Sequence, residues 1–117
     1  MAALAEMKCT ACRAGENPLE VSQIEKYHED IPEWSLSNED GVEKLRRTYK
    51  FEDFNHALDF TNEVGKLAEE EGHHPIIQTE WGGVTVTWWT HKIDGLHKND
   101  FLMAAKCDEV YKEGKNE

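Results

Sequence analysis

The chain has 117 residues, of which 38% are hydrophobic and 32% are charged, as expected for one globular domain. No stretch of the sequence approaches the ~20 apolar residues that span a bilayer. Thirteen basic and twenty-four acidic side chains leave a formal net charge of −11, which opposes binding to the phosphates of nucleic acids or of anionic membranes. We therefore expect neither a direct nucleic-acid partner nor a membrane partner.

The number of cysteines gives an indication of the cellular compartment. The chain contains Cys9, Cys12 and Cys107. An odd number of cysteines, and an opening stretch too short and weakly apolar for a secretory signal, favour reduced thiols inside the cell. We expect the cytoplasm, with the nucleus or an organelle left open. Cys9-x-x-Cys12 lacks the second pair that a four-ligand zinc site needs, so ordinary thiols are the first interpretation and a metal or redox role the alternative.

The first third of the chain predicts an arm, a helix and the start of a sheet. Residues 1–18 are expected to form an irregular arm, and residues 19–117 a single domain. Apolar side chains at helical spacing predict an amphipathic helix over 19–29. After Ile31-Pro32, the segment 34–36 can begin a strand, and 37–41 has the composition of a turn.

A half-buried strand and the longest helix come next. Residues 42–51 alternate apolar and charged or polar side chains, which predicts the strand. The helix is expected over 53–71, with Asp53 as N-cap and Gly72 in the left-handed conformation at its end. Its apolar stripe consists of Phe54, Ala57, Leu58, Thr61, Val64, Leu67 and Ala68.

Two further strands and a helix complete the chain. Residues 76–81 and 84–90 read as strands joined by a two-residue turn at Gly82-Gly83. A last helix is expected over 99–112. The resulting order, α-β-β-α-β-β-α, predicts an α+β fold: a four-stranded antiparallel sheet with three helices on one face. Because 84–90 is uncharged and β-prone, we expect it to be central in the sheet or paired across a subunit boundary, and we expect a homo-oligomer.

Histidines supply the strongest functional signal. Four of the six, His73, His74, His91 and His97, lie within 25 residues. If Gly82-Gly83 forms the turn, Trp81 pairs with Val84, and the same ladder continued outward places His74 opposite His91. His73 then lies one residue away. The predicted register thus forms a cluster of three imidazoles.

Three interpretations of this cluster stay open. The histidines can be solvated caps of strand ends, or three of them can hold zinc, although His73 and His74 should point to opposite faces of a strand. They can also transfer protons, since imidazole titrates nearest to physiological pH. Acidic residues stand close by in the sequence at Glu69, Glu70 and Glu71, and for at least two of them a solvated charge run is the simpler explanation.

Two other side chains are candidates with ordinary alternatives. Asp100 stands near the start of the last helix, where an acid satisfies free backbone amides, so as a bare residue it is more simply a cap than a catalyst. Trp34 can line a pocket or pack in the core. Trp88 shares a face with Val84 and Val86 and is expected in the core.

The spacing of these residues resembles the signature of a known family. Glu69-x3-His73-His74-Pro75, followed by five residues, Trp81, nine residues, His91, eight residues and Asp100, is similar to the pterin-4a-carbinolamine dehydratase signature. The arm with Cys9-x2-Cys12, the short helix and Trp34 are also similar to many members. Phe51-x2-Phe54-Asn55 and Ala57 fit the start of the family's long helix.

The resemblance implies an α+β fold with a four-stranded antiparallel sheet and three helices, homodimers or homotetramers, and no metal or organic cofactor. It implies a hydro-lyase that converts 4a-hydroxytetrahydrobiopterin to quinonoid dihydropterin and water, in support of tetrahydrobiopterin recycling. The pterin would then be the small-molecule partner. Some animal members also bind a homeodomain transcription factor and stabilise its dimer, so the alternative function is that of a protein-binding dimerisation cofactor.

The resemblance also assigns roles to residues. His73 and His74 would serve as acid and base in an order left open, and His91 would hold the pterin and share in proton transfer. The substrate-binding residues would be Trp34, Asp100 and Glu69, with Trp34 over the bicyclic ring and Asp100 orienting a histidine or the loop beneath it. The chain departs from the family pattern at Glu33, where glycine is frequent, and at His97, where a small capping hydroxyl residue is common.

Overall fold

The computed structural model describes residues 19–115, so the expected arm over 1–18, with Cys9 and Cys12, lies outside the described residues. The elements are α1 (Val21–His28), β1 (Ser35–Glu39), β2 (Val42–Lys50), α2 (Phe54–Glu71), β3 (Ile76–Glu80), β4 (Gly83–Trp88), the 3-10 helix η2 (His91–Ile93) and α3 (Lys98–Lys115). This confirms the predicted order, with η2 added before the last helix.

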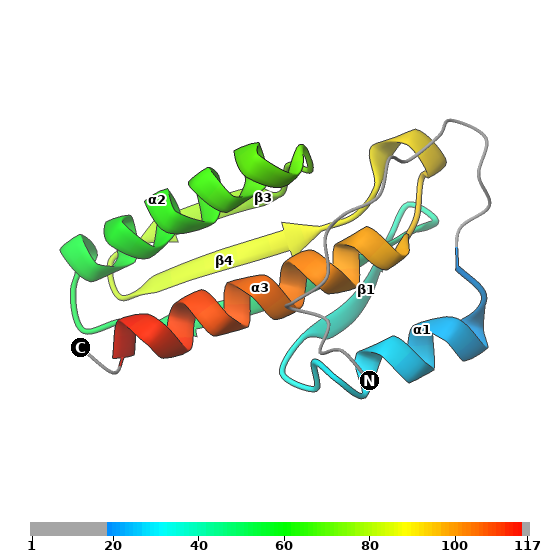
Figure 1. Cartoon of the computed structure of the whole chain (residues 1–117), viewed down its shortest axis with the longest axis horizontal. Coiled ribbons are helices and arrows are strands. Elements are labelled where there is room, and N and C mark those ends of the chain that lie inside the picture. The colour runs from blue at the N-terminus through cyan, green and yellow to red at the C-terminus, as the bar shows by residue number, and fades with distance from the viewer. Residues whose placement is uncertain (1–18, 116–117) are drawn as a thin grey trace.

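The strands form one antiparallel sheet in the order β1-β2-β4-β3. β4 is therefore central, as its uncharged sequence predicts, and the edges of the sheet are β1 and β3. Helices α2 and α3 lie side by side across the sheet, and α1 packs against α3 (Figure 1). No helix among the described residues is long and apolar enough to cross a membrane.

Both predicted ends of α2 are confirmed. Oδ1 of Asp53 accepts a hydrogen bond of 2.8 Å from the backbone N–H of His56, and Gly72 ends the helix with φ of 65°. The predicted apolar stripe is partly wrong, because Phe54 and Leu58 are exposed. Phe60, which that stripe omits, is buried.

Both hairpin loops differ from the prediction, the first in its length and the second in its position. β1 continues to Glu39, so the first loop is only Asp40-Gly41, both with positive φ as a type I′ turn requires. In the second hairpin Glu80 pairs with Gly83, which makes the loop Trp81-Gly82. The predicted Gly82-Gly83 loop is wrong, because a single residue with positive φ, Gly82 at 80°, closes the turn.

This correction removes the predicted pairing of His74 with His91. The observed register aligns Ile76 with Thr87, and the ladder ends there. Both histidines lie beyond the paired part of the strands. Any association between them must come from the segments that follow α2 and β4, and not from a shared ladder.

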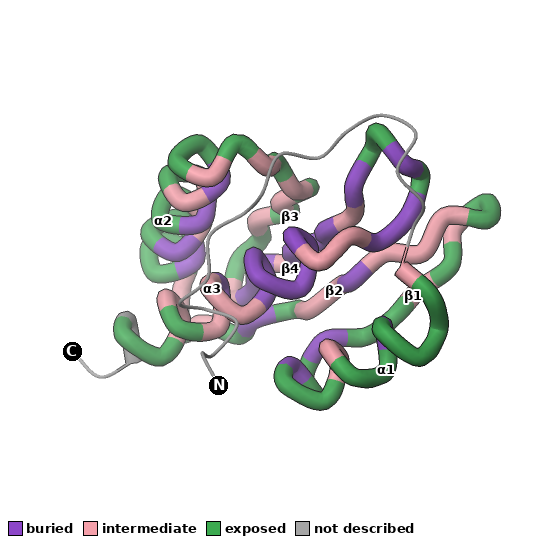
Figure 2. Tube along the Cα trace, turned by 45° about the vertical axis from the view of Figure 1, so that its right-hand side comes forward, coloured by how far each residue is buried: buried purple, intermediate pink, exposed green. Residues whose placement is uncertain are grey.

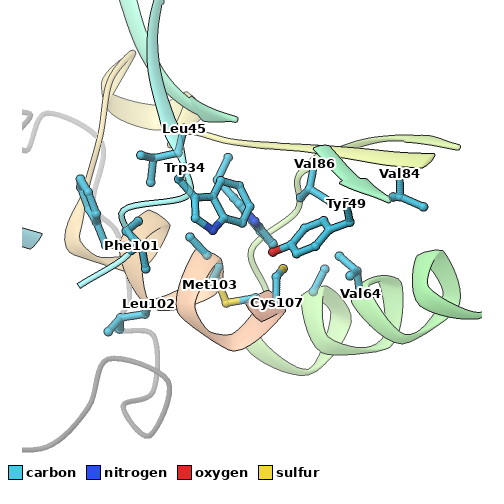
Figure 3. Packing of buried hydrophobic residues seen from close by; sticks show 14 of the residues in the cluster. Trp34, Leu45, Tyr49, Val64, Val84, Val86, Phe101, Leu102, Met103 and Cys107 are labelled. Atoms are coloured by element: carbon cyan, nitrogen blue, oxygen red, sulfur yellow. The ribbon is translucent and has the colours of Figure 1, made fainter. Parts of the chain in front are cut away.

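The core lies between the sheet and the helices. Buried positions line β4 and the inner sides of α2 and α3, while the outer turns of the helices are exposed (Figure 2). Trp34, Tyr49 and Cys107 come together in its centre with residues of the sheet and of α3 (Figure 3). The fully buried side chains include Trp34, Leu45, Tyr49, Val84, Val86, Trp88, Phe101 and Met103.

Candidate functional site

His73 is held by a buried carboxylate. Its Nε2 atom lies 2.6 Å from Oδ1 of Asp100, and the exposed fractions of the two side chains are 13% and 0%. An ionised carboxylate only accepts hydrogen bonds, so Nε2–H of His73 is the donor. The imidazole also stacks on the indole of Trp88, with ring centroids 5.5 Å apart and planes 11° from parallel. The orientation of His73 is therefore set from two sides.

Asp100 is fixed in turn by the beginning of α3. Its Oδ2 accepts a hydrogen bond of 2.8 Å from the hydroxyl of Thr90 and one of 2.9 Å from the backbone N–H of His97. The latter is one half of a capping box. The side chain of His97 caps the helix separately, since its Nδ1 accepts a hydrogen bond of 3.1 Å from the backbone N–H of Asn99, the second residue of α3. Asp100 is thus both the helix cap expected from sequence and the partner of a histidine.

His74 pairs with the end of α2. Its Nε2 lies 2.5 Å from Oε1 of Glu69, and both side chains are well exposed, at 61% and 78%. The left-handed Gly72 reverses the chain, so that His74 returns beside the last turn of the helix. A carboxylate thus contacts each of the two adjacent histidines, of which His73 is partly buried and His74 is exposed.

His91 follows the end of β4 and begins η2. Its exposed imidazole contacts the indole of Trp89, with ring centroids 4.3 Å apart. Its chain neighbour Thr90 is the residue that bonds Asp100, and Asp100 bonds His73. The segments carrying His73 and His91 are therefore joined through Thr90 and Asp100, although not by the ladder pairing that the sequence predicted.

Trp34 lies elsewhere. It is only 1% exposed, and its Nε1 donates a hydrogen bond of 3.0 Å to Oδ1 of Asp108. Its ring meets that of Tyr49 edge-on, with centroids 6.1 Å apart. These are core contacts, which correspond to the packing alternative given for Trp34. Its expected place over a substrate ring stays a prediction.

The roles of three residues in this region were not predicted from the sequence. Thr90 and the capping role of His97 hold Asp100, and Trp88 stacks on His73 besides filling the core. A signal existed for His97, since a cap residue followed three positions later by an acid is the pattern of a capping box. It is easily overlooked because histidine is not among the usual N-cap residues.

Two further observations concern binding. Among residues 19–115, no three or more His, Cys, Asp or Glu side chains are grouped so that they could hold a metal ion. A hollow of about 530 Å³ lies elsewhere, over β1 and β2, and shares none of the predicted site residues. It is lined by Glu33, Ser35, Ser37, Arg46, Arg47 and Thr48.

The fold and the histidine–carboxylate pairs can be compared with known proteins. The family model described as pterin 4 alpha carbinolamine dehydratase matches residues 17–110. Proteins named "Putative pterin-4-alpha-carbinolamine dehydratase" are similar over nearly their whole length. The one from Nitrosococcus oceani is 54% identical over 93% of this chain and 96% of its own, and the one from Microcystis aeruginosa is 47% identical over 97% of each.

A solved structure agrees with these relatives. The crystal structure of a transcriptional coactivator/pterin dehydratase from Brucella melitensis superimposes with a TM-score of 0.73 at 30% identity. The match covers 81% of this chain and 99% of that one. The chain belongs to the pterin-4a-carbinolamine dehydratase family, which confirms the resemblance seen in the sequence.

Proposed function

We propose that the chain is a hydro-lyase that dehydrates 4a-hydroxytetrahydrobiopterin to quinonoid dihydropterin and so supports tetrahydrobiopterin recycling. Family membership supports the substrate class. The observation that carries the proposal is the 2.6 Å contact of His73 with the buried Asp100, one residue from the exposed His74. Two neighbouring imidazoles, each oriented by a carboxylate, can give one proton and take another.

The reaction needs both transfers. The bond between C4a and its hydroxyl oxygen breaks, and the electron pair leaves with the oxygen, which takes a proton from one imidazole and departs as water. A ring N–H of the pterin loses its proton to another imidazole, and the freed electron pair forms the C=N bond of the quinonoid product. We assign these transfers to His73 and His74, in an order left open, and the holding of the pterin, with a share in proton transfer, to His91.

The carboxylates have supporting roles in this proposal. Asp100 accepts from Nε2–H of His73 and so leaves Nδ1 of that ring for proton exchange. We assign to Glu69 the orientation of His74, which it contacts at the surface, and a contact with the bound pterin. Trp34 is 1% exposed, so it can cover the pterin ring only if the surrounding chain moves.

Stopped-flow measurement of carbinolamine dehydration tests the proposal. Alanine at His73, His74 or His91 is expected to lower the rate by roughly 10²–10⁴-fold while circular dichroism stays unchanged. The control is His56→Ala, a histidine on the exposed side of α2, which should leave the rate unaltered. Pretreatment with a chelator is also expected to leave it unaltered. Full dehydration by all three site variants would refute the assignment.

A second candidate function is binding to another protein, since the Brucella melitensis relative is described as a transcriptional coactivator as well as a pterin dehydratase. Phe54 and Leu58 lie four positions apart on α2 and are 42% and 38% exposed, so they offer an apolar helix surface. This function predicts a saturable complex with a dimeric transcription factor domain that survives His73→Ala and is lost in Leu58→Glu.

A further inference from the structure

The last residue of β4 and the three residues that follow it alternate between two sides of the chain. Trp88 and Thr90 are buried and contact His73 and Asp100, respectively. Trp89 and His91, between and after them, are more exposed and contact each other, with ring centroids 4.3 Å apart and planes at 49°. Thr90 has the extended backbone that such alternation requires. One side of this short segment therefore contacts His73 and its partner Asp100, and the other side carries His91.

The sheet register places a lysine beside Trp89. β2 and β4 pair up to Leu45 and Trp88, and one further step along that register sets Lys44 opposite Trp89. Nζ of Lys44 lies 4.1 Å from the centroid of the Trp89 ring, a cation–π contact. The side chain of Lys44 is only 16% exposed, which strengthens this attraction because little water competes for the ammonium group.

Lys44 is itself anchored. Its Nζ lies 2.9 Å from Oε2 of Glu39, while Oε1 of Glu39 accepts a hydrogen bond of 2.8 Å from Nη2 of Arg46. The bonds from Arg46 and then Lys44 lower the pKa of Glu39, which therefore remains ionised at neutral pH. Strands β1 and β2 thereby fix the ammonium group against the indole.

His91 differs from the other two histidines of the site in that no carboxylate of the described residues contacts its ring. Asp100 holds His73 and Glu69 holds His74, whereas the imidazole of His91 has no hydrogen bond with any described residue. Because the second side-chain torsion of histidine is broad, an unsupported ring samples many orientations. We propose that Trp89, held by Lys44, is the positioning residue of His91. This inference rests on the proposed function for its catalytic meaning, but the contact itself can be measured without substrate.

The catalytic consequence is tested with a double-mutant cycle. Trp89→Leu is expected to lower kcat/KM by about tenfold, because a misplaced catalytic group loses rate without being removed. Trp89→Phe keeps an aromatic ring and should retain most of the rate. In the His91→Ala background, Trp89→Leu should cost nothing further, since the residue it positions is already gone. Equal losses in both backgrounds would overturn the inference, because Trp89 would then act independently of His91.

The contact is tested in the free protein by nuclear magnetic resonance. The carbon-bound protons of the His91 imidazole should show ring-current shifts that disappear in Trp89→Leu and decrease in Lys44→Met. The matched control is Trp81→Leu, which removes the 75% exposed tryptophan at the hairpin tip and should leave these shifts unchanged. If Trp89→Leu does not fold, the His91 shifts in Lys44→Met test the contact instead. Unaltered His91 resonances in that variant would overturn the inference. If the parent protein shows these His91 shifts but has no dehydratase activity, the proposed function is refuted, whereas the positioning of His91 by Trp89 is still supported.

Discussion

His73 and Asp100 are 27 positions apart in the chain and are joined by a 2.6 Å hydrogen bond between Nε2 and Oδ1. Helix α2 ends just before the first residue, and helix α3 begins just before the second. The bond therefore ties the end of one helix to the start of the other. The side chain of Asp100 is completely buried, and its second oxygen, Oδ2, accepts hydrogen bonds from Thr90 and His97.

Asp100→Asn tests this arrangement. The amide can accept on one side only, so its NH₂ group must face either His73 or the donors Thr90 and His97. We expect kcat to fall about 10²-fold, because His73 loses its tautomer or its orientation. Stopped-flow dehydration measures the loss. The exposed Asp94, at left-handed φ, provides the control, since Asp94→Asn tolerates the same backbone and should retain full activity.

Asp108 is predicted to stabilise the fold rather than the reaction. Its Oδ1 accepts hydrogen bonds from Nε1 of Trp34, Nη1 of Arg47 and the hydroxyl of Tyr49, so it links β2 and the segment before β1 to α3. Asp108→Ala leaves these partly buried donors unpaired and should lower the free energy of unfolding by about 2–4 kcal/mol. Urea denaturation checks this. Glu109→Ala, next to it in an exposed pair with Lys112, should change stability by less than about 0.5 kcal/mol.

The pair at the start of α2 predicts a pH-dependent stability. Hydrogen bonds to the backbone and ring of His56 lower the pKa of Asp53, while Asp53 raises the pKa of His56 above 6.5. The Asp53 contribution is present above its unfolded value of 3.8 and is lost as the pH falls through the lower folded value. The His56 contribution is complete below 6.5 and is lost as the pH rises through the higher folded value.

Urea unfolding of His56→Ala measures the effect. We expect the variant to be less stable than the parent near pH 5.5, with the difference shrinking by pH 9. Lys66→Ala, in an exposed pair with Glu63 on the same helix, should show a small cost that is the same at both pH values. A His56→Ala penalty that grows toward pH 9 would contradict this prediction.

Cys107 is predicted to be an unreactive thiol. It is completely buried, and burial raises its pKa, so almost no thiolate forms at neutral pH. In a Cys9→Ser/Cys12→Ser background, a disulfide reagent should modify Cys107 only as fast as the protein unfolds. Addition of urea supplies the positive control. Rapid modification of the folded protein would show that the core opens at α3.

Much of the fold was predictable because local signals and packing agree. The cap at Asp53, the left-handed Gly72 and the uncharged β4 each have one satisfactory structural solution, and each was confirmed. The hairpin register was not predictable from composition. Two successive glycines at Gly82-Gly83 offer more than one loop position, and the choice depends on which residue the central strand pairs with. The exposed Phe54 and Leu58 likewise show that apolar spacing does not reveal how wide a buried face is.

The sequence singled out several residues of the candidate site, and only the family resemblance implied that Asp100 orients a histidine. His73 and Asp100 were both singled out, yet their pairing depends on how α2 and α3 lie over the sheet, which no local pattern encodes. Thr90 carries no signal of its own, since threonine is common in strands. The association of Lys44 with Trp89 follows from the register of β2 and β4, so it became visible only once that register was known.

The order of the strands also has a kinetic consequence. Each hairpin closes a two-residue loop, whereas the pairing of β2 with β4 joins residues such as Leu45 and Trp88, which are 43 positions apart. Closing so long a loop costs more entropy than forming either hairpin, so we expect docking of the two halves to limit the folding rate. Trp88 belongs to the pairing of β2 with β4 and also stacks on His73. Catalytic activity should therefore appear only in the last step of folding.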